Sequence, residues 1–183
     1  MTARSSSLQR LVRRCHAFPV NEDEKIQDIA VAMIRRHSMN PEEWRYTSIG
    51  ALRSDIGQQL PLSPGELVLV SAFFSEESWY VFTTQRIVSK FEGSVALLDP
   101  HRGIDSEFGN FKGYPRGNNT LLGSIATATA TLKNSGSRLR LEFETGKPSM
   151  APIYATKYWS QKHPILHKLL TNAERESYKT RNA

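Results

Sequence analysis

Two histidines four residues apart are the first candidate for chemistry in this 183-residue chain. His163 and His167 would share one face of a helix, and imidazoles at such a spacing bind metal ions such as zinc. The run H-P-I-L-H contains no acidic ligand, however, and Pro164 disturbs the helical geometry that would bring the rings together. We therefore interpret both as surface or helix-end histidines, and we expect no metal and no other cofactor.

A second group of reactive side chains lies in residues 99–107, where three carboxylates accompany a histidine. Paired carboxylates act as acid and base or bind a divalent cation. The group of Asp99, His101, Asp105 and Glu107 would thus permit a metal-dependent hydrolase. Asp-Pro followed by glycine is also ordinary turn composition. The turn is the preferred interpretation, and a hydrolase is the weakest of three functional hypotheses.

Cys15 is the single cysteine of the chain. It allows no intramolecular disulfide and no cysteine-based metal site. Its neighbour His16 could serve as the base for a thiol nucleophile, but adjacent residues rarely hold that geometry, and no third group orients them. We accordingly expect a protein that is not an enzyme.

The best candidate for a binding surface is a glycine-rich loop over residues 109–119. Lys112 and Arg116 stand among its glycines, and backbone amides beside cations suit an anionic partner. Phe111 and Tyr114 could stack on a base or anchor a protein partner. The glycines lack the spacing of a phosphate-binding P-loop. The alternative interpretation is a connection whose aromatic side chains fold back onto the sheet.

Charge is distributed unevenly along the chain, whose net charge is +6. Residues 1–20 carry four arginines and no acid, and residues 112–183 carry twelve basic and four acidic side chains. Through Lys112, Arg116, Lys133, Arg138 and Arg140, the basic C-terminal half could bind an anionic lipid headgroup or nucleic acid. The plainer interpretation is a solvated face of a basic protein.

The elements that would position these groups begin after residue 20. Asn21 is a good helix N-cap, with Glu24 three residues later as a capping box requires. Apolar side chains then recur at helical spacing and predict one buried face. The members of this stripe are Ile26, Ile29, Ala30, Met33 and Ile34.

A second helix is predicted to start at Pro41, with Asn40 as its cap and Trp44 packed inward. Residues 21–65 therefore form a helical extension, preceded by a mobile basic arm over residues 1–20. Residues 66–183 form the main domain.

From residue 67 onward, short apolar runs and alternation predict strands. Seven are expected, at residues 67–74, 79–82, 86–91, 95–98, 104–108, 123–132 and 138–144. The aromatic stretch at residues 78–93 reads as a central hairpin with a polar turn at Thr83-Thr84-Gln85-Arg86. A final helix over residues 158–179 places Ile165, Leu166, Leu169 and Leu170 on an apolar face, which would cap the open end of the sheet.

This hairpin has the form Tyr-Val-Phe-Thr-Thr-x-Arg-Ile followed by Ile-Val-Ser-x-Phe-x-Gly. Its defining residues are Tyr80, Val81, Phe82, Thr83, Thr84, Arg86, Ile87, Val88, Ser89, Phe91 and Gly93. Through this hairpin the chain resembles bacterial pleckstrin-homology-like (PH-like) domains, and the resemblance covers residues 66–172. Phe108-Gly109-Asn110-Phe111-Lys112-Gly113 is similar to a later strand and loop of such domains. The resemblance implies binding of peptides, proteins or sometimes phosphoinositides, without catalysis.

The expected fold is therefore α+β, with a helical N-terminal lead-in. A seven-stranded antiparallel curled sheet follows, a partly open PH-like barrel capped by a C-terminal helix. No apolar run is long enough for a signal peptide or a membrane span, so we expect a soluble cytoplasmic protein. The preferred function is a binding module for another protein, such as an inhibitor of the immunity-protein kind or an adaptor. The second hypothesis is an anionic ligand, held by the basic C-terminal half.

Overall fold

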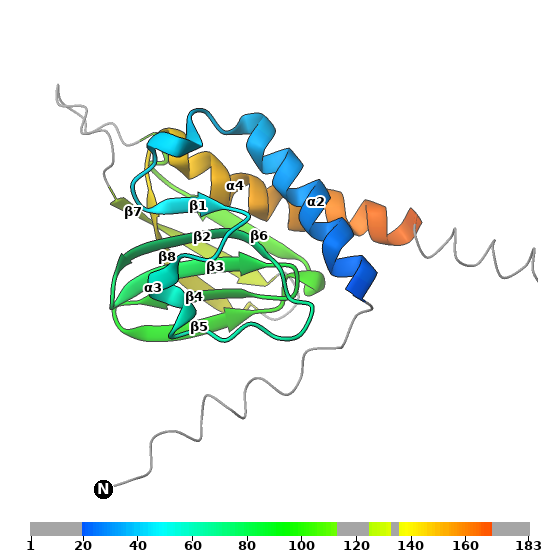
Figure 1. Ribbon diagram of the computed structural model, residues 1–183, viewed down its shortest axis with the longest axis horizontal. Coiled ribbons are helices and arrows are strands. Elements are labelled where there is room, and N and C mark those ends of the chain that lie inside the picture. The colour runs from blue at the N-terminus through cyan, green and yellow to red at the C-terminus, as the bar shows by residue number, and fades with distance from the viewer. Residues whose placement is uncertain (1–19, 113–124, 133–135, 170–183) are drawn as a thin grey trace, which may run out of the picture.

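The computed structural model describes residues 20–112, 125–132 and 136–169. Two antiparallel sheets lie beside a pair of helices, which run together along one side of the strands in Figure 1. The helices are α2 (Val20–His37) and α4 (Met150–Lys157); α4 continues through a π turn, η5 (Tyr158–Lys162), to residue 169. Within these described ranges, no helix has the length and apolar character that crossing a membrane requires.

One sheet has five strands in the order β1-β2-β3-β4-β5, and the other has three in the order β6-β7-β8. Within each sheet, every strand pairs antiparallel with the next along the chain, and β5 and β6 do not pair. The strands are β1 (Thr47–Ile49), β2 (Val68–Ser75), β3 (Ser78–Thr83), β4 (Ile87–Phe91), β5 (Ser94–Leu98), β6 (Ile104–Phe108), β7 (Ile125–Leu132) and β8 (Arg138–Glu144). Two short helices lie between strands, α3 (Ser54–Gly57) and η3 (Pro100–Arg102). Two others join the strands to the long helices, η2 (Pro41–Glu43) after α2 and η4 (Lys147–Ser149) before α4.

The mixed α+β class, with antiparallel strands and a C-terminal helix, is confirmed. The seven predicted strands correspond to β2 through β8. They form two sheets instead of one curled sheet, and the described strands do not close into a barrel. An eighth strand, β1, lies in the segment predicted to be helical. The C-terminal helix starts at Met150, well before the predicted residue 158.

β1 forms because Glu144, at the end of β8, binds the chain at its start. The Glu144 carboxylate accepts hydrogen bonds from the backbone N–H of Arg45 at 3.2 Å and of Tyr46 at 3.1 Å. It also accepts one from the Thr47 hydroxyl at 3.2 Å. The prediction of a second helix is therefore wrong: η2, β1 and α3 occupy that segment, because the chain there is held by an acceptor 99 residues away.

α2 presents most of its predicted apolar stripe to the core. Ile26, Ala30 and Ile34 are buried as expected, but Ile29 is 38% exposed. The helix starts at Val20, so Asn21 lies within its first turn and is not the N-cap. Acidic residues in the first turn and basic ones in the last agree with the helix dipole.

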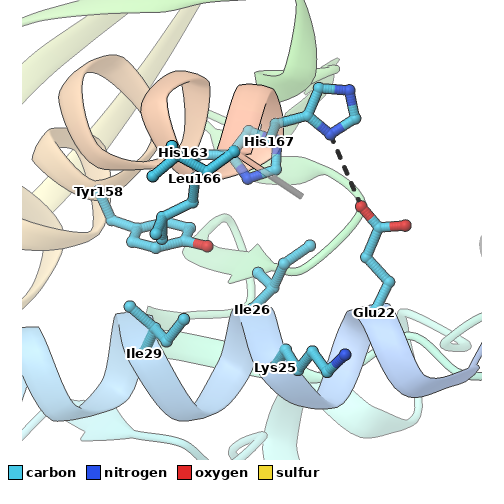
Figure 2. Close-up of a pocket in the computed structure, with 9 residues that line it drawn as sticks. Glu22, Lys25, Ile26, Ile29, Tyr158, His163, Leu166 and His167 are labelled. Carbon is cyan, nitrogen blue, oxygen red and sulfur yellow. Dashed lines mark ion pairs between the residues drawn. The ribbon is translucent and has the colours of Figure 1, made fainter. Parts of the chain in front are cut away.

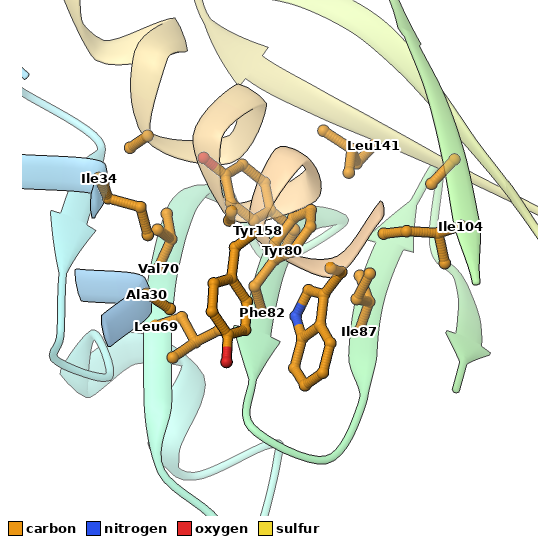
Figure 3. Close-up of a cluster of buried hydrophobic side chains, with 14 of the residues drawn as sticks. Ala30, Ile34, Leu69, Val70, Tyr80, Phe82, Ile87, Ile104, Leu141 and Tyr158 are labelled. Carbon is orange, nitrogen blue, oxygen red and sulfur yellow. The ribbon is translucent and has the colours of Figure 1, made fainter. Parts of the chain in front are cut away.

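Both faces of the central strand β3 are buried. Tyr80 and Phe82 point into the main core between the two sheets and the helices, where Ile104 of β6 also packs (Figure 3). Trp79 and Val81 point to the opposite face and belong to a smaller cluster. This alternation explains why the aromatic stretch lies at the centre of the larger sheet.

The hairpin predicted at residues 78–93 is confirmed, since β3 and β4 pair in register with Tyr80 opposite Ser89. Its polar turn is buried, however. Arg86 forms a bidentate ion pair with Glu66, with Nε–Oε1 at 2.7 Å and Nη2–Oε2 at 2.9 Å. The Thr83 hydroxyl donates to the same carboxylate at 2.7 Å. The turn is thereby fixed to the segment that precedes β2.

Replacing Arg86 tests how much this ion pair contributes to the free energy of unfolding. Arg86→Met leaves the Glu66 carboxylate buried without its partner, which costs about 3–5 kcal/mol. We expect the free energy of unfolding, measured by urea denaturation, to fall by that amount. The double variant Glu66→Leu/Arg86→Met removes both charges and should recover most of the loss. A decrease below about 1 kcal/mol in the single variant would contradict this account.

Candidate functional site

A pocket of about 320 Å³ lies between the first turns of α2 and the end of the described C-terminal helix (Figure 2). Its surface is mostly apolar. The lining residues are Glu22, Lys25, Ile26, Ile29, Tyr158, His163, Leu166, His167 and Leu169. This volume and lining suit one large apolar group that also meets a few convergent polar atoms.

Large apolar side chains around this pocket remain exposed. Ile29 reaches its mouth from α2, and Leu169, which is 59% exposed, reaches it from the C-terminal helix. Ile165 lies on the same helix and is 60% exposed, but it does not line the pocket. Exposed apolar side chains that gather around a concavity are typical of an interaction site.

A π turn in the C-terminal helix shapes the floor of the pocket. In η5 the backbone N–H of His163 donates to the carbonyl of Tyr158, five residues earlier, whereas an α-helix bonds residues four apart. Tyr158, Trp159 and His163 are all buried along this wider turn. Pro164 follows directly and has no N–H to donate, so the irregular turn lies next to it. Such turns occur frequently at functional sites.

Three histidines meet at this floor. The His163 ring lies 4.9 Å from that of His101 in η3 and 5.6 Å from that of His167, measured between ring centroids. Burial lowers the pKa of His163 to about 4, and the two neighbouring histidines contribute because they disfavour a further positive charge. Burial also lowers the pKa of His101, against the opposing effect of Asp99. The rings of His163 and His101 are therefore polar but uncharged at neutral pH.

The Tyr158 hydroxyl is the second polar group of the floor. Burial, and to a smaller extent the charge of Glu22, raise its pKa, so the hydroxyl stays protonated. Within the described part of the chain, neither this hydroxyl nor the His163 ring has a hydrogen-bond partner. Each can donate one hydrogen bond to an acceptor that enters the pocket.

The two histidines of the H-P-I-L-H run have different environments. His167 is exposed and lies 3.8 Å from a carboxylate oxygen of Glu22, so the two form an ion pair when His167 is protonated. His163 is only 7% exposed, so its prediction as a surface or helix-end histidine is wrong. Among the described residues, no group of three or more His, Cys, Asp or Glu side chains is arranged to hold a metal ion.

The binding residues predicted from the sequence lie elsewhere. Tyr114, Arg116 and Lys133 fall outside the described residues. Phe111 is half-buried and packs against the main core, while Lys112 is exposed. Arg138 and Arg140 are exposed on β8. None of the four that the structure describes lines the pocket.

The outer face of the three-stranded sheet carries both signs of charge. One cross-strand row is Asp105, Thr131 and Arg138, and the next is Glu107, Thr129 and Arg140. Strands lie about 4.8 Å apart, so the acidic and basic side chains are separated by one row of threonines. The carboxylates of β6 thus accompany the arginines of β8 on one mixed face.

Asp99 does not join these carboxylates. It accepts the backbone N–H of His101 at 3.0 Å and lies 3.4 Å from the Arg102 guanidinium. This is the turn role that its Asp-Pro sequence favours.

Comparisons of the chain with protein-family models, with curated proteins and with solved structures find no match. The site is therefore defined by its geometry. The sequence did not identify Tyr158 as part of it, because a π turn has no clear sequence signature. One signal was available: a Tyr-Trp pair with a histidine and a proline shortly after it, inside an otherwise helical segment.

The lowered pKa of His163 predicts that acid destabilises this region. In the folded chain burial favours the neutral form of the His163 ring, whose pKa is about 4. In the unfolded chain the ring protonates near pH 6.5. The stability it contributes is complete above about pH 6.5 and is lost as the pH falls toward 4, by up to about 3 kcal/mol. Urea denaturation across this range should show a smaller pH dependence in His163→Gln. The exposed control Gln161→Ala should keep the dependence of the parent protein, and an unchanged slope in His163→Gln would contradict the assignment.

Proposed function

We propose that this protein is a non-catalytic binding module whose partner is another protein, and that the partner inserts a large apolar side chain into the pocket between α2 and residues 163–169. The observation that carries the proposal is an apolar pocket whose mouth is lined by exposed Ile29 and Leu169. Such a mouth is open to a macromolecule, and burial of the inserted side chain would supply affinity.

The polar floor supports the same assignment. A chain segment that enters the pocket brings backbone carbonyls with it, and buried carbonyls need donors. The Tyr158 hydroxyl and the His163 ring supply donors that no described residue uses. Because both groups are neutral, they accept a neutral segment without leaving a buried charge unpaired.

The order of elements supports a PH-like module. β2 to β8 followed by the C-terminal helix give seven strands and one helix, the arrangement that the resemblance implies. α2 and β1 are additions to this plan, and α2 supplies one wall of the pocket. We therefore propose that α2, which a minimal PH-like domain lacks, completes the pocket against the C-terminal helix, in a protein with the role of an inhibitor or an adaptor.

An anionic lipid headgroup or nucleic acid on the basic C-terminal half is the alternative. It has less support, because Asp105 and Glu107 lie on the same outer face as Arg138 and Arg140. Contacts with phosphates would make binding fall steeply with salt, whereas insertion of an apolar side chain would not.

A matched pair of substitutions tests the proposed pocket. Leu169→Glu and Ile165→Glu change side chains of nearly equal exposure on one helix, but only Leu169 lines the pocket. The partner is captured with the full-length protein, identified by mass spectrometry, purified and titrated by calorimetry. We expect Leu169→Glu to weaken binding at least tenfold, because it places a charge against the inserted apolar group. Ile165→Glu should change affinity less than twofold.

The proposal is wrong if both variants bind as tightly as the parent protein or are weakened equally. It is also wrong if binding disappears at high salt in the manner of a phosphate ligand, which would support the anionic alternative.

A further inference from the structure

The end strand β5 of the five-stranded sheet has apolar side chains in solvent. Val95 is 50% exposed and Leu97 is 39% exposed. Residues two apart on a strand share a face, so both continue the face on which Val88, opposite Leu97, is buried. Among the described strands, β5 has a ladder partner on one side only, which is β4.

The turn before β5 shows which of its backbone groups point outward. Glu92 and Gly93, with φ of 50° and 77°, form a two-residue loop between paired Phe91 and Ser94. The pair that closes such a hairpin exchanges both backbone hydrogen bonds, and the pattern then alternates along the strand. The N–H and C=O groups of Ser94, Ala96 and Leu98 therefore point to β4. Those of Val95 and Leu97 point away from it.

The other end strands of both sheets have features that discourage further pairing, whereas β5 has none. β1 has only three residues. β6 carries Asp105 and Glu107, and β8 carries Arg138 and Arg140. Short length and charged side chains are the usual means of protecting an edge strand. β5 reads S-V-A-L-L, without charge, proline or bulge.

We propose that β5 pairs antiparallel with β5 of a second copy of this chain, about a two-fold axis that passes beside Ala96. In this register Val95 of one copy lies opposite Leu97 of the other. The outward backbone groups of these residues then satisfy one another, as a ladder requires. The two five-stranded sheets become one continuous sheet.

The side chains of β5 are complementary to themselves in this register. Each exposed Val95 packs against a Leu97 of the second copy, and such apolar cross-strand pairs stabilise a sheet. The Glu92 end of one strand lies beside the far end of the other, where Arg102 is exposed and contacts its own Asp99 at 3.4 Å. An antiparallel arrangement thus brings the Glu92 carboxylate toward the Arg102 guanidinium of the second copy. A closed isologous contact of this kind gives a dimer and not a filament.

A disulfide cross-link tests the register. In a Cys15→Ser background, Ala96→Cys places two thiols opposite each other at a non-hydrogen-bonded pair, where Cα atoms are about 4.5 Å apart. This lies within the range that a disulfide spans. Mild oxidation should give a covalent dimer in high yield. Ser94→Cys is the matched control: two such residues would lie about 13 Å apart along the strands, so no dimer should form.

Sedimentation velocity of the full chain gives a second readout that needs no cysteine. The parent protein should form a concentration-dependent dimer, and Val95→Lys should raise its dissociation constant at least tenfold. Circular dichroism of Val95→Lys should be unchanged, since the side chain is half exposed. A parent protein that stays monomeric at several hundred micromolar would overturn the proposal. So would a dimer that Val95→Lys leaves intact, or equal cross-linking through Ser94→Cys and Ala96→Cys.

Discussion

The buried ion pair between Arg86 and Glu66 is the constraint on which the arrangement of the fold depends. Two charges leave water in this pair, and they are tolerated because each has several partners. Beyond the bidentate contact, Arg86 donates to the carbonyl of Pro61 at 2.8 Å, and Glu66 accepts the backbone N–H of Ser63 at 2.7 Å. The long connection before β2 is thereby fixed against the turn of the central hairpin, and the position of the sheet's first long strand follows from it.

The same turn also positions the pocket, although the pocket lies among helices. The carbonyl of Thr84 accepts a hydrogen bond from the His101 ring at 3.2 Å, which orients the ring that lies against His163. The amide of Gln85 donates to Asp23 at 3.2 Å and so holds the first turn of α2. Hydrogen bonds from this one buried turn therefore help to position both walls of the pocket. The four polar residues that were predicted as a tight turn thus connect the sheet to the proposed binding site.

The sequence was sufficient for elements whose signal is local. β3 and β4 follow from their aromatic and β-branched composition, β8 from alternation, and the apolar stripe of α2 from its helical period. What it could not show depends on residues far apart. β1 needs the Glu144 carboxylate from the end of β8, and the burial of Arg86 needs Glu66, 20 residues earlier. The π turn could not be predicted from the sequence for another reason. A helix that widens by one residue per turn keeps the composition of an ordinary helix. Consequently the fold class was predictable, and the pocket was not.

Buried polar atoms without partners show where this fold departs from optimal stability. In the described part of the chain they include Oδ1 of Asp23 and Nε1 of Trp159. Each such atom costs about 1–3 kcal/mol. Asp23 lies beside Glu22 in α2, and Trp159 lies beside Tyr158 in the π turn, so both adjoin residues that line the pocket. A sequence selected for stability alone would remove such groups, and violations of this kind concentrate where function sets the residue. Their position therefore favours the junction of α2 and the C-terminal helix as the functional surface over the strands beneath it.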